Sequence, residues 1–490
     1  MTKVTVVGGG LAGMTAALRL LERGCEVELF DAGARLGGKA GAVQHGGDWD
    51  EHGYHIFPLW YLNSWKLIDD LGIRDHFVDC HEFHQYFGDG VTPRKVLTDF
   101  TSIRHALTNL TSGIASIWQM TLYFCAAFDL LSQPYSRRAF LDQLSVNGFL
   151  RSRFYRTEAI AHLFQSSVVG GSSAPSYEAS AMTFRNVLRY WMEYPLPMSR
   201  ILRGDLQQFY ILPFQRRLEE LGCDIRFNQS LRHIELDGGR IKRLHVEDLT
   251  TMETHLIDVD QVVIAIPAEK LALLVDDALF GADPNLGRIH NLKARPMAAF
   301  NLYLKRRIPG LPASHVNLLH SQYGLSFIDV SQVWEGYDTT VLNCIAASFV
   351  DLTSLSPERA LERLVEDMMR FMPELTWEDI DRTDFQSHLR EPLVMNDAGA
   401  WQFRPEARTQ IENLYLAGDY CRSHVDLVTM ESAVTSGLLA AEALRADAGL
   451  PDPIAVLEPK GFPQWLLSLG SILLIPVAAV ARLMVWITER

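Results

Sequence analysis

The N-terminal segment MTKVTVVGGGLAG constrains the fold most strongly, because a glycine-rich turn joins a short apolar strand to a helical pattern. Residues 4–7 form the apolar run, and residues 8–13 follow the spacing Gly-x-Gly-x-x-Gly. A second apolar strand covers residues 26–31 and ends on Asp31. This β-α-β unit predicts a parallel α/β fold of the Rossmann type. In such a fold the pyrophosphate of a dinucleotide approaches the glycines at the helix N-terminus.

The residues after this unit bear on which dinucleotide is bound. Asp31 stands 18 residues beyond Gly13, where a carboxylate can accept hydrogen bonds from an adenosine ribose in either NAD or FAD. A second glycine pair follows at once, in Arg35-Leu36-Gly37-Gly38-Lys39. It lets another stretch of backbone approach a long ligand, and its two cations can neutralise a diphosphate. The second motif therefore favours FAD.

A third motif lies near the other end of the chain. Leu416-Ala417-Gly418-Asp419 ends a short apolar strand, and Met430 opens a helix. We expect Asp419 to accept hydrogen bonds from sugar-like hydroxyls between the diphosphate and the ring. The helix N-terminus favours a group that becomes anionic on reduction, as the N1–C2=O edge of a flavin does. Together the three motifs predict an FAD site.

Composition narrows the remaining classes of protein. The formal net charge is −14, which argues against nucleic acid as a partner, because phosphate binding needs clustered Lys and Arg. The six cysteines lie far apart and form no Cys-x-x-Cys pair, so neither a zinc site nor a disulfide framework is predicted. No metal ligand is proposed. The content of 48% hydrophobic and 21% charged residues is typical of a globular protein.

The two ends of the chain differ in character. The first strand begins within four residues of Met1, which leaves no room for a targeting peptide and predicts a cytoplasmic body. Residues 465–487 are apolar except for Arg482, and Trp465 and Trp486 stand near the ends as interface aromatics do. We expect this tail to associate with membrane lipid, either spanning the bilayer or lying flat. A helix docked on the body or on a second subunit is the alternative. Residues 107–128 carry no charge and predict a buried helical region, with a membrane-facing lip as the alternative.

The assembly VVGGGLAGMTAALRL, ELFDAGARLGGKAG, NLYLAGDY and MESAVTSGLLAAEAL resembles the FAD-dependent amine oxidase and carotenoid desaturase superfamily. The resemblance implies a glutathione reductase-like, Rossmann-type FAD-binding domain that is interleaved with a mixed sheet-plus-helix substrate domain. No cysteine lies between Cys344 and Cys421, the stretch where covalent-flavin amine oxidases carry theirs, so noncovalent FAD is implied. The implied FAD contacts are Gly8, Gly10, Gly13, Asp31, Ala32, Arg35, Gly37, Gly38, Lys39, Leu231, Ala265, Pro267, Gly418, Asp419 and Met430.

The same resemblance implies where the domains lie in the sequence. The FAD-binding domain is expected to be discontinuous, and the substrate domain fills the gaps. A proline-rich linker precedes the apolar C-terminal helix. The predicted boundaries are 1–90, 205–290 and 405–447 for the FAD-binding domain, 91–204 and 291–404 for the substrate domain, 448–464 for the linker and 465–487 for the tail.

Two segments indicate which group within the superfamily the chain resembles. Residues 51–61 (EHGYHIFPLWY) and 204–236 are similar to segments of plant and cyanobacterial phytoene and ζ-carotene desaturases. The first block departs from that group, which has Phe-Gly where Pro58-Leu59 stands here. A second departure is Ser432, where the group has glycine. Both departures fall near the expected flavin, so the identity of the substrate stays open.

The candidate catalytic residues are Tyr54, His55 and Glu431. His55 is a candidate base or polariser because the ordinary pKa of histidine is near neutrality, although a structural role is the alternative. Glu431 can also serve only to complement its helix dipole. Arg404 is a candidate to hold a diphosphate or a quinone, and a structural ion pair is as plausible.

The predicted function is desaturation of a long isoprenoid, such as a carotenoid precursor, by an FAD-dependent oxidoreductase at a membrane. The alternatives are a flavin amine oxidase, a protoporphyrinogen-type oxidase and a redox-neutral polyene isomerase. A non-enzymatic FAD protein is a further class. The expected partners are a hydrophobic small molecule and membrane lipid. A quinone electron acceptor and a second copy of the chain are additional candidates.

Overall fold

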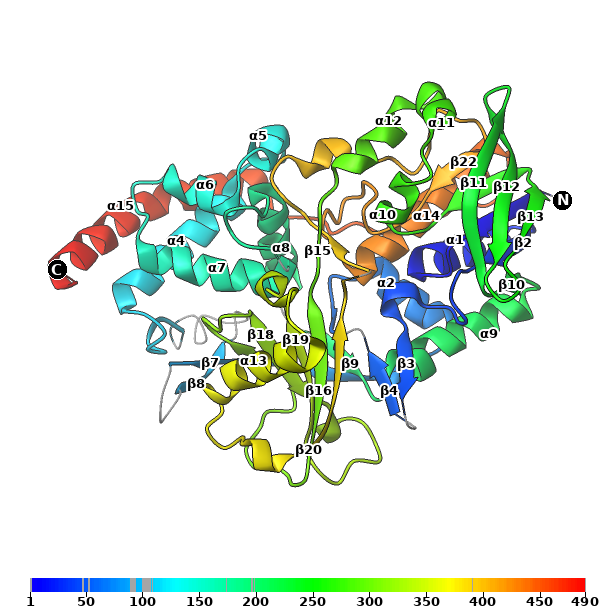
Figure 1. The fold of residues 1–490 in the computed structure, drawn as a ribbon. Helices are drawn as coiled ribbons and strands as arrows, with labels where there is room; N and C mark the ends of the chain where they lie inside the picture. The colour runs from blue at the N-terminus through cyan, green and yellow to red at the C-terminus, as the bar shows by residue number, and fades with distance from the viewer. Residues whose placement is uncertain are drawn as a thin grey trace.

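A computed structural model shows a parallel sheet at the centre of one half of the molecule (Figure 1). The structure describes residues 2–45, 48–51, 53–88, 94–98, 107, 109–172, 174–194, 197, 199–389 and 391–489. Within them this sheet has the strand order β10-β2-β1-β14-β22, and all neighbouring strands are parallel. The strands are β1 (Lys3–Val7), β2 (Glu26–Phe30), β10 (Asp224–Arg226), β14 (Gln261–Ile264) and β22 (Leu414–Leu416).

The order of the strands fixes where a ligand can bind. The chain runs from β1 to β2 on one side and returns to β14 on the other, so the order reverses between β1 and β14. Val4 pairs with Val27 of β2 and with Gln261 of β14, and its side chain is fully buried. In open parallel sheets, ligands bind beyond the carboxyl ends of the strands at such a reversal. The predicted α/β fold with a Rossmann-type sheet is confirmed.

Helices and a small antiparallel sheet cover the two faces of this parallel sheet. Helices α1 and α14 pack closely, because Gly437 lies so near α1 that a Cβ there would stand 2.3 Å from the Ala12 carbonyl oxygen. The other face packs against an antiparallel meander and short helices. The elements are α1 (Leu11–Leu21), α2 (Leu62–Asp70), α9 (Leu212–Glu220) and α14 (Met430–Asp447) on one side, and β11 (Gln229–Asp237), β12 (Arg240–Asp248), β13 (Glu253–Asp258), α10 (Ala268–Ala272), α11 (Asp277–Ala282) and α12 (Pro284–Gly287) on the other.

A second, larger sheet forms the base of the other half. Among the described residues its order is β20-β16-β19-β18-β17-β7-β8, and helix α13 (Pro357–Met369) packs on it. Its strands are β7 (Phe83–Phe87), β8 (Arg94–Thr98), β16 (Ala298–Leu304), β17 (Val316–Leu318), β18 (Leu325–Asp329), β19 (Val341–Ala346) and β20 (Ile380–Ser387). Smaller pairings are made by β3 (Ala42–His45) with β4 (Asp48–Glu51), by β5 (Phe57–Pro58) and β6 (Phe77–Cys80) with β9 (Ser199–Leu202), and by β15 (Ala294–Arg295) with β21 (Leu393–Val394).

One predicted boundary needs correction. The sequence prediction placed residues 83–87 in the FAD-binding domain, but β7 pairs in parallel with β17, with Val316 opposite His84. A distant strand therefore draws this segment into the second sheet, and local patterning gave no sign of it. The predicted boundary at residues 90–91 lies outside the described residues.

A layer of helices lies beside the two sheets and carries the C-terminal helix. Helix α15 runs along α4, and its end projects from the body at the left of Figure 1. It is the one helix in the described part of the chain with the length and apolar composition to cross a membrane, and the mean hydropathy of its most apolar 18-residue stretch is 2.1. Within 107–128, α4 buries Leu122, Cys125 and Ala126 but exposes Ile117, so burial is confirmed for only part of this uncharged stretch. These helices are α4 (Ile117–Ser132), α5 (Arg138–Asp142), α6 (Val146–Arg151), α7 (Glu158–Ser172), α8 (Ala181–Glu193) and α15 (Gln464–Thr488).

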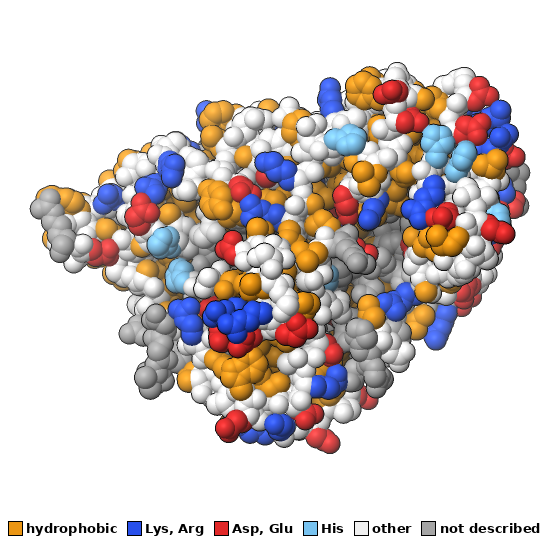
Figure 2. Space-filling model, in the orientation of Figure 1, with side chains coloured by type: hydrophobic (Ala, Val, Ile, Leu, Met, Phe, Trp, Pro, Cys, Tyr) orange, Lys and Arg blue, Asp and Glu red, His pale blue; other side chains and the backbone are white. Residues whose placement is uncertain are grey.

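The surface carries no large region of one charge on the face drawn in Figure 2, where acidic and basic side chains are interspersed. A nucleic-acid-binding surface would gather Lys and Arg on one face or along one helix.

Candidate functional site

Segments far apart in the sequence meet at the carboxyl edge of the parallel sheet. Directly after the four strands β1, β2, β14 and β22 stand Gly8, Asp31, Ala265 and Ala417, in that order. Because these strands are parallel neighbours, their ends lie side by side. The structure thus brings the three sequence motifs to one edge, as a shared cofactor site requires.

The three glycines of the first motif are needed for different structural reasons. Gly8 has φ +109°, and a Cβ there would lie 2.5 Å from the Ala265 carbonyl oxygen. A Cβ at Gly13 would lie 1.9 Å from the Gly8 carbonyl oxygen. At Gly10 a Cβ would meet nothing within 4 Å. Gly8 and Gly13 are therefore required by the packing of the protein itself, whereas Gly10 borders open space.

The second glycine motif lies directly against the first. The Gly37 amide donates to the Gly9 carbonyl oxygen at 2.8 Å. A Cβ at Gly38 would stand 3.2 Å from the Gly10 Cα, and Gly38 has φ +56°. Two backbone loops thus line the space beside Gly10 without side chains.

This space fits the diphosphate of FAD. Gly10 is the N-cap of α1, and no side chain caps the helix there. The unpaired amides of a helix N-terminus bind anions, and the absence of a capping side chain keeps the approach open. By contrast, Ser116 and Thr429 cap the helices that follow them with their hydroxyls.

Asp31 holds the glycine loop in place. One of its carboxylate oxygens accepts from the Gly9 amide at 2.6 Å, and the other accepts from the Gly33 amide at 2.6 Å. Burial raises the pKa of Asp31, and these two donors oppose that shift. Ala32 is exposed beside it, while Leu231 is buried on β11. Asp31 therefore has a structural role in addition to the ribose contact predicted from the sequence.

The two cations of the second motif are placed differently. Lys39 Nζ donates to the Pro392 carbonyl oxygen at 2.7 Å and lies 3.7 Å from a carboxylate oxygen of Glu269. It fastens the glycine loop to α10 and to the 392 loop. Arg35 is half-buried and has no hydrogen-bond partner among the residues described, so its contact with a diphosphate stays a prediction from the sequence.

The third motif is fixed to α14. The Gly418 amide donates to the Ser436 hydroxyl at 2.8 Å, and the Ser432 hydroxyl donates to the Asp419 carbonyl oxygen at 3.2 Å. Met430 is the first residue of α14 and is half-buried. Pro267 is the N-cap of α10 at the end of the neighbouring strand. Ser432, which departs from the desaturase pattern, thus helps to orient the strand end.

The Glu431 carboxylate is buried and hydrogen-bonded to the start of α2. It is fully buried, and one carboxylate oxygen accepts from the Asn63 amide and from Asn63 Nδ2, both at 2.9 Å. The other accepts from the Ser64 amide at 2.8 Å. These amides belong to the first turn of α2, so Glu431 caps that helix. Because both oxygens are already bonded, the geometry assigns Glu431 to positioning rather than to proton transfer.

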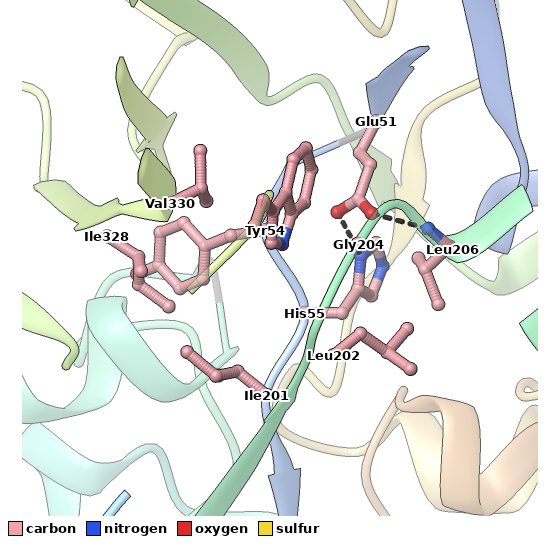
Figure 3. A pocket seen from close by; sticks show the side chains of 10 residues that line it. Glu51, Tyr54, His55, Ile201, Leu202, Gly204, Leu206, Ile328 and Val330 are labelled. Atoms are coloured by element: carbon pink, nitrogen blue, oxygen red, sulfur yellow. Dashed lines mark hydrogen bonds and ion pairs between the residues drawn. The ribbon is translucent and has the colours of Figure 1, made fainter. Parts of the chain in front are cut away.

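Tyr54 and His55 lie against β18 of the second sheet and the segment that includes β9. The Tyr54 hydroxyl donates to the Ser326 hydroxyl of β18 at 2.5 Å. His55 Nδ1 lies 3.7 Å from a Glu51 carboxylate oxygen, and the other Glu51 oxygen accepts from the Leu206 amide at 2.7 Å (Figure 3). They border a cavity of about 20 Å³, which has room for about one water molecule. The lining residues are Glu51, Tyr54, His55, Ile201, Leu202, Gly204, Leu206, Ile328, Val330 and Trp334.

A buried charged cluster near the start of α14 was not found from the sequence. Asp426 has φ +46° and pairs with Arg138, whose Nη2 is 2.9 Å from its carboxylate. Burial raises the pKa of Asp426 to about 6 although Arg138 and Arg404 lower it. Arg404 is buried, and neither of its Nη nitrogens has a hydrogen-bond partner among the described residues. Their donors are available to an oxygen atom of a ligand or of water. The cluster joins α5 to the 426 loop, a contact that no local pattern predicts.

A pH dependence follows from Glu431, whose pKa is raised by burial to about 7 from an ordinary value of 4.5. The folded protein holds this proton more tightly than the unfolded chain does. The stability contributed by Glu431 is therefore lost as pH rises from about 4.5 to about 7. We expect the Tm of the wild type minus the Tm of Glu431→Gln to be more positive at pH 5 than at pH 8, as measured by thermal unfolding. An equal difference at both pH values would contradict the shift.

Comparison with known proteins agrees with this geometry. The sequence profile of the family described as flavin containing amine oxidoreductase matches residues 11–445. The chain is 26% identical over 460 residues to the 15-cis-phytoene desaturase of Synechococcus elongatus, covering 91% of this chain and 96% of that protein. It is 22% identical to the zeta-carotene desaturase of Synechocystis sp., covering 91% and 97%. A solved structure of a putative protoporphyrinogen oxidase from Exiguobacterium sp. superposes with a TM-score of 0.66 at 19% identity, covering 91% and 99%, which shows a shared fold.

Proposed function

Because the chain belongs to the family of flavin containing amine oxidoreductases and is an FAD-dependent oxidoreductase, we propose that it desaturates a long hydrophobic isoprenoid at a membrane. The observation that carries this proposal is the similarity to phytoene and zeta-carotene desaturases over 91% of the chain. A carotenoid precursor such as 15-cis-phytoene is the proposed substrate. The exposed apolar helix α15 supports action on a molecule that resides in lipid.

In such a reaction the side chains of the protein have only a few roles. Bound FAD supplies the acceptor for a hydride. The protein must hold the reacting C–H bond in place, exclude water and receive one proton. His55 is our candidate to receive the proton, and Glu51 to orient its ring, because Glu51 is itself held by the Leu206 amide. We propose that FAD is held without a covalent bond, which release of the yellow cofactor on acid precipitation would support.

The role of His55 predicts a specific kinetic loss. We expect His55→Ala to lower kcat by about a hundredfold, since general-base catalysis contributes on that order. Its FAD content should remain unchanged. The matched control is Tyr54→Phe, which removes only the hydroxyl bond to Ser326 and should lower kcat far less. Wild-type kcat in His55→Ala, measured at several pH values, would rule out the role in proton transfer.

A second candidate function is oxidation of a soluble amine or a porphyrinogen. The observation that favours it is the fold shared with a putative protoporphyrinogen oxidase. Vesicles that carry 15-cis-phytoene distinguish the two, because desaturation lengthens the conjugated system and moves the absorbance of the extracted product to longer wavelength. Peroxide formed with an amine or a porphyrinogen, and an unchanged polyene, would favour the second function. A product of equal mass with moved or isomerised double bonds would indicate a redox-neutral isomerase.

Membrane association predicts an effect of the exposed face of α15. Leu469, Leu473 and Val480 are about half exposed or more, at 49%, 63% and 56%. Changing all three to Gln should abolish flotation with lipid vesicles, because each removes apolar surface from the bilayer. The Tm should change little, since these side chains do not face the body. The matched control, Thr488→Gln, should float as the wild type does. Flotation of the triple variant would contradict the role of α15.

A further inference from the structure

Helix α15 is fixed along its length to a helix of the body. At its start, Gln464 Nε2 donates to the Ser132 carbonyl oxygen at 2.6 Å, at the end of α4. Within its second turn, a Cβ at Gly470 would lie 2.7 Å from the Phe128 ring. At its far end, the Glu489 carboxylate accepts from Gln119 Nε2 at 2.7 Å, in the first turn of α4. The two helices therefore lie antiparallel and are held at both ends.

Helix α4 is in turn part of the body. Its Asp129 carboxylate accepts from Arg153 Nε at 2.7 Å and from the Tyr155 hydroxyl at 2.6 Å. It also packs against α7 and α8. The Asp129–Arg153 ion pair holds the end of α4 in the body, and it cannot follow α15 into hydrocarbon, because burying its two charges there is costly.

These contacts limit how α15 can meet a bilayer. With 25 residues α15 is about 37 Å long, which exceeds the roughly 30 Å of the hydrocarbon core. A crossing helix would have to separate from α4 over its whole length, or draw α4 and its neighbours with it. Only a narrow stripe of α15 faces the body, including Leu467, Ala478, Ala481 and Val485, all less than 10% exposed.

The rest of the helix surface is open and mostly apolar, with Arg482 as its one charged residue. Leu466, Leu473, Leu483 and Ile487 are 47% to 63% exposed along the full length of α15. Trp465 and Trp486 stand at its two ends and are 69% and 50% exposed. An apolar face that continues from end to end suits a flat lipid surface, and tryptophan at both ends suits the depth of the headgroups.

The segment that follows α4 adds positive charge that anionic lipid headgroups can bind. Residues 134–156 follow the end of α4 and contain five arginines and one aspartate, in a chain whose net charge is −14. Arg137 and Arg151 are exposed, and so are the aromatic side chains of Tyr135, Phe140 and Phe154, at 55% to 60%. Arginines beside exposed aromatics are typical of a surface that meets anionic headgroups. The segment begins two residues after Ser132, whose carbonyl oxygen accepts from Gln464 at the start of α15.

We infer that α15 lies flat in one leaflet of an anionic membrane, still packed on α4, and that Arg137, Arg151 and the exposed aromatics of residues 134–156 contact the headgroups beside it. The inference rests on the proposed membrane-associated function and adds the orientation and the lipid class. The family profile ends at residue 445, before this helix.

Cysteine labelling tests the orientation, because all six native cysteines are buried. Lys460→Cys places a thiol before α15, and Thr488→Cys places one at its end; both positions are exposed. The two full-length variants are labelled with a membrane-impermeant maleimide in sealed vesicles whose outer surface carries the body. We expect both thiols to react without detergent. Protection of Thr488→Cys until detergent is added, with Lys460→Cys reactive, would show a spanning helix and overturn the flat orientation, while membrane association would stand.

Flotation of the purified protein tests the lipid class. Binding to phosphatidylcholine vesicles should strengthen when phosphatidylglycerol is included. Arg137→Gln combined with Arg151→Gln should weaken binding to the anionic vesicles by roughly thirtyfold, at about 1 kcal/mol for each arginine. It should leave binding to neutral vesicles unchanged. Equal binding of this variant and the wild type to anionic vesicles would overturn the headgroup contact. Absence of flotation with either lipid, together with a dimer in sedimentation, would assign the face to a second copy and overturn membrane association as well.

Discussion

A valine at position 10 is expected to give a folded protein without FAD. A Cβ at Gly10 meets no protein atom within 4 Å, so the added side chain can be accommodated by the protein alone. The same side chain would occupy the space between the two glycine loops, where the diphosphate must approach the start of α1. We expect Gly10→Val to purify colourless, with a Tm close to that of the wild-type apoprotein.

The matched comparison is Gly13→Ala, in which a smaller change should have a larger effect on folding. Its Cβ would stand 1.9 Å from the Gly8 carbonyl oxygen, so the backbone of β1 or α1 has to move. Overpacking of this kind costs about 1–3 kcal/mol or more. We expect Gly13→Ala to lower the free energy of unfolding even without FAD. Stoichiometric FAD in purified Gly10→Val would contradict the assignment of the cradle.

Loss of the Glu431 side chain is expected to destabilise the protein by about 3–5 kcal/mol. Glu431→Ala leaves the Asn63 and Ser64 backbone amides buried without their acceptor, while Asn63 Nδ2 keeps its bond to the Leu457 carbonyl oxygen. An unsatisfied buried polar group costs about 1–3 kcal/mol, and the cavity adds to that cost. Because α2 begins at these amides, the effect should include fraying of that helix. Urea unfolding of the apoprotein measures it.

Glu412→Ala is the control for Glu431→Ala. Glu412 is 69% exposed and its partner is the surface residue Arg240, so its removal should cost less than about 1 kcal/mol. If Glu431→Ala had wild-type stability but no activity, the positioning role would be wrong, and the catalytic role predicted from the sequence would regain support.

The cofactor site could be predicted from the sequence because its signals are local. Gly8, Gly10 and Gly13 stand at fixed spacing after an apolar strand, and Asp31 ends the next strand. The geometry of a parallel sheet then places the strand ends together. For the same reason β22 could be joined to this site through Gly418, although about 400 residues separate it from β1.

The parts that could not be predicted depend on contacts between distant segments. The sequence does not show that Lys39 reaches Pro392, or that Glu431 meets the first turn of α2. Nor does it show that Asp426 pairs with Arg138. Each of these side chains has a suitable chemistry for several roles, and only its packing environment selects among them. The same holds for β7, whose partner strand is more than 200 residues away.

The measurement that tests the central claim most directly is anaerobic reduction of the bound flavin by vesicles that carry 15-cis-phytoene. We expect the absorbance of oxidised flavin to decay, and each reduced flavin to be matched by one new double bond in the extracted polyene. Empty vesicles are the control and should leave the spectrum unchanged. A spectrum that stays oxidised with phytoene and related polyenes, but bleaches with an amine or a porphyrinogen, would contradict isoprenoid desaturation and leave a flavin oxidase in its place.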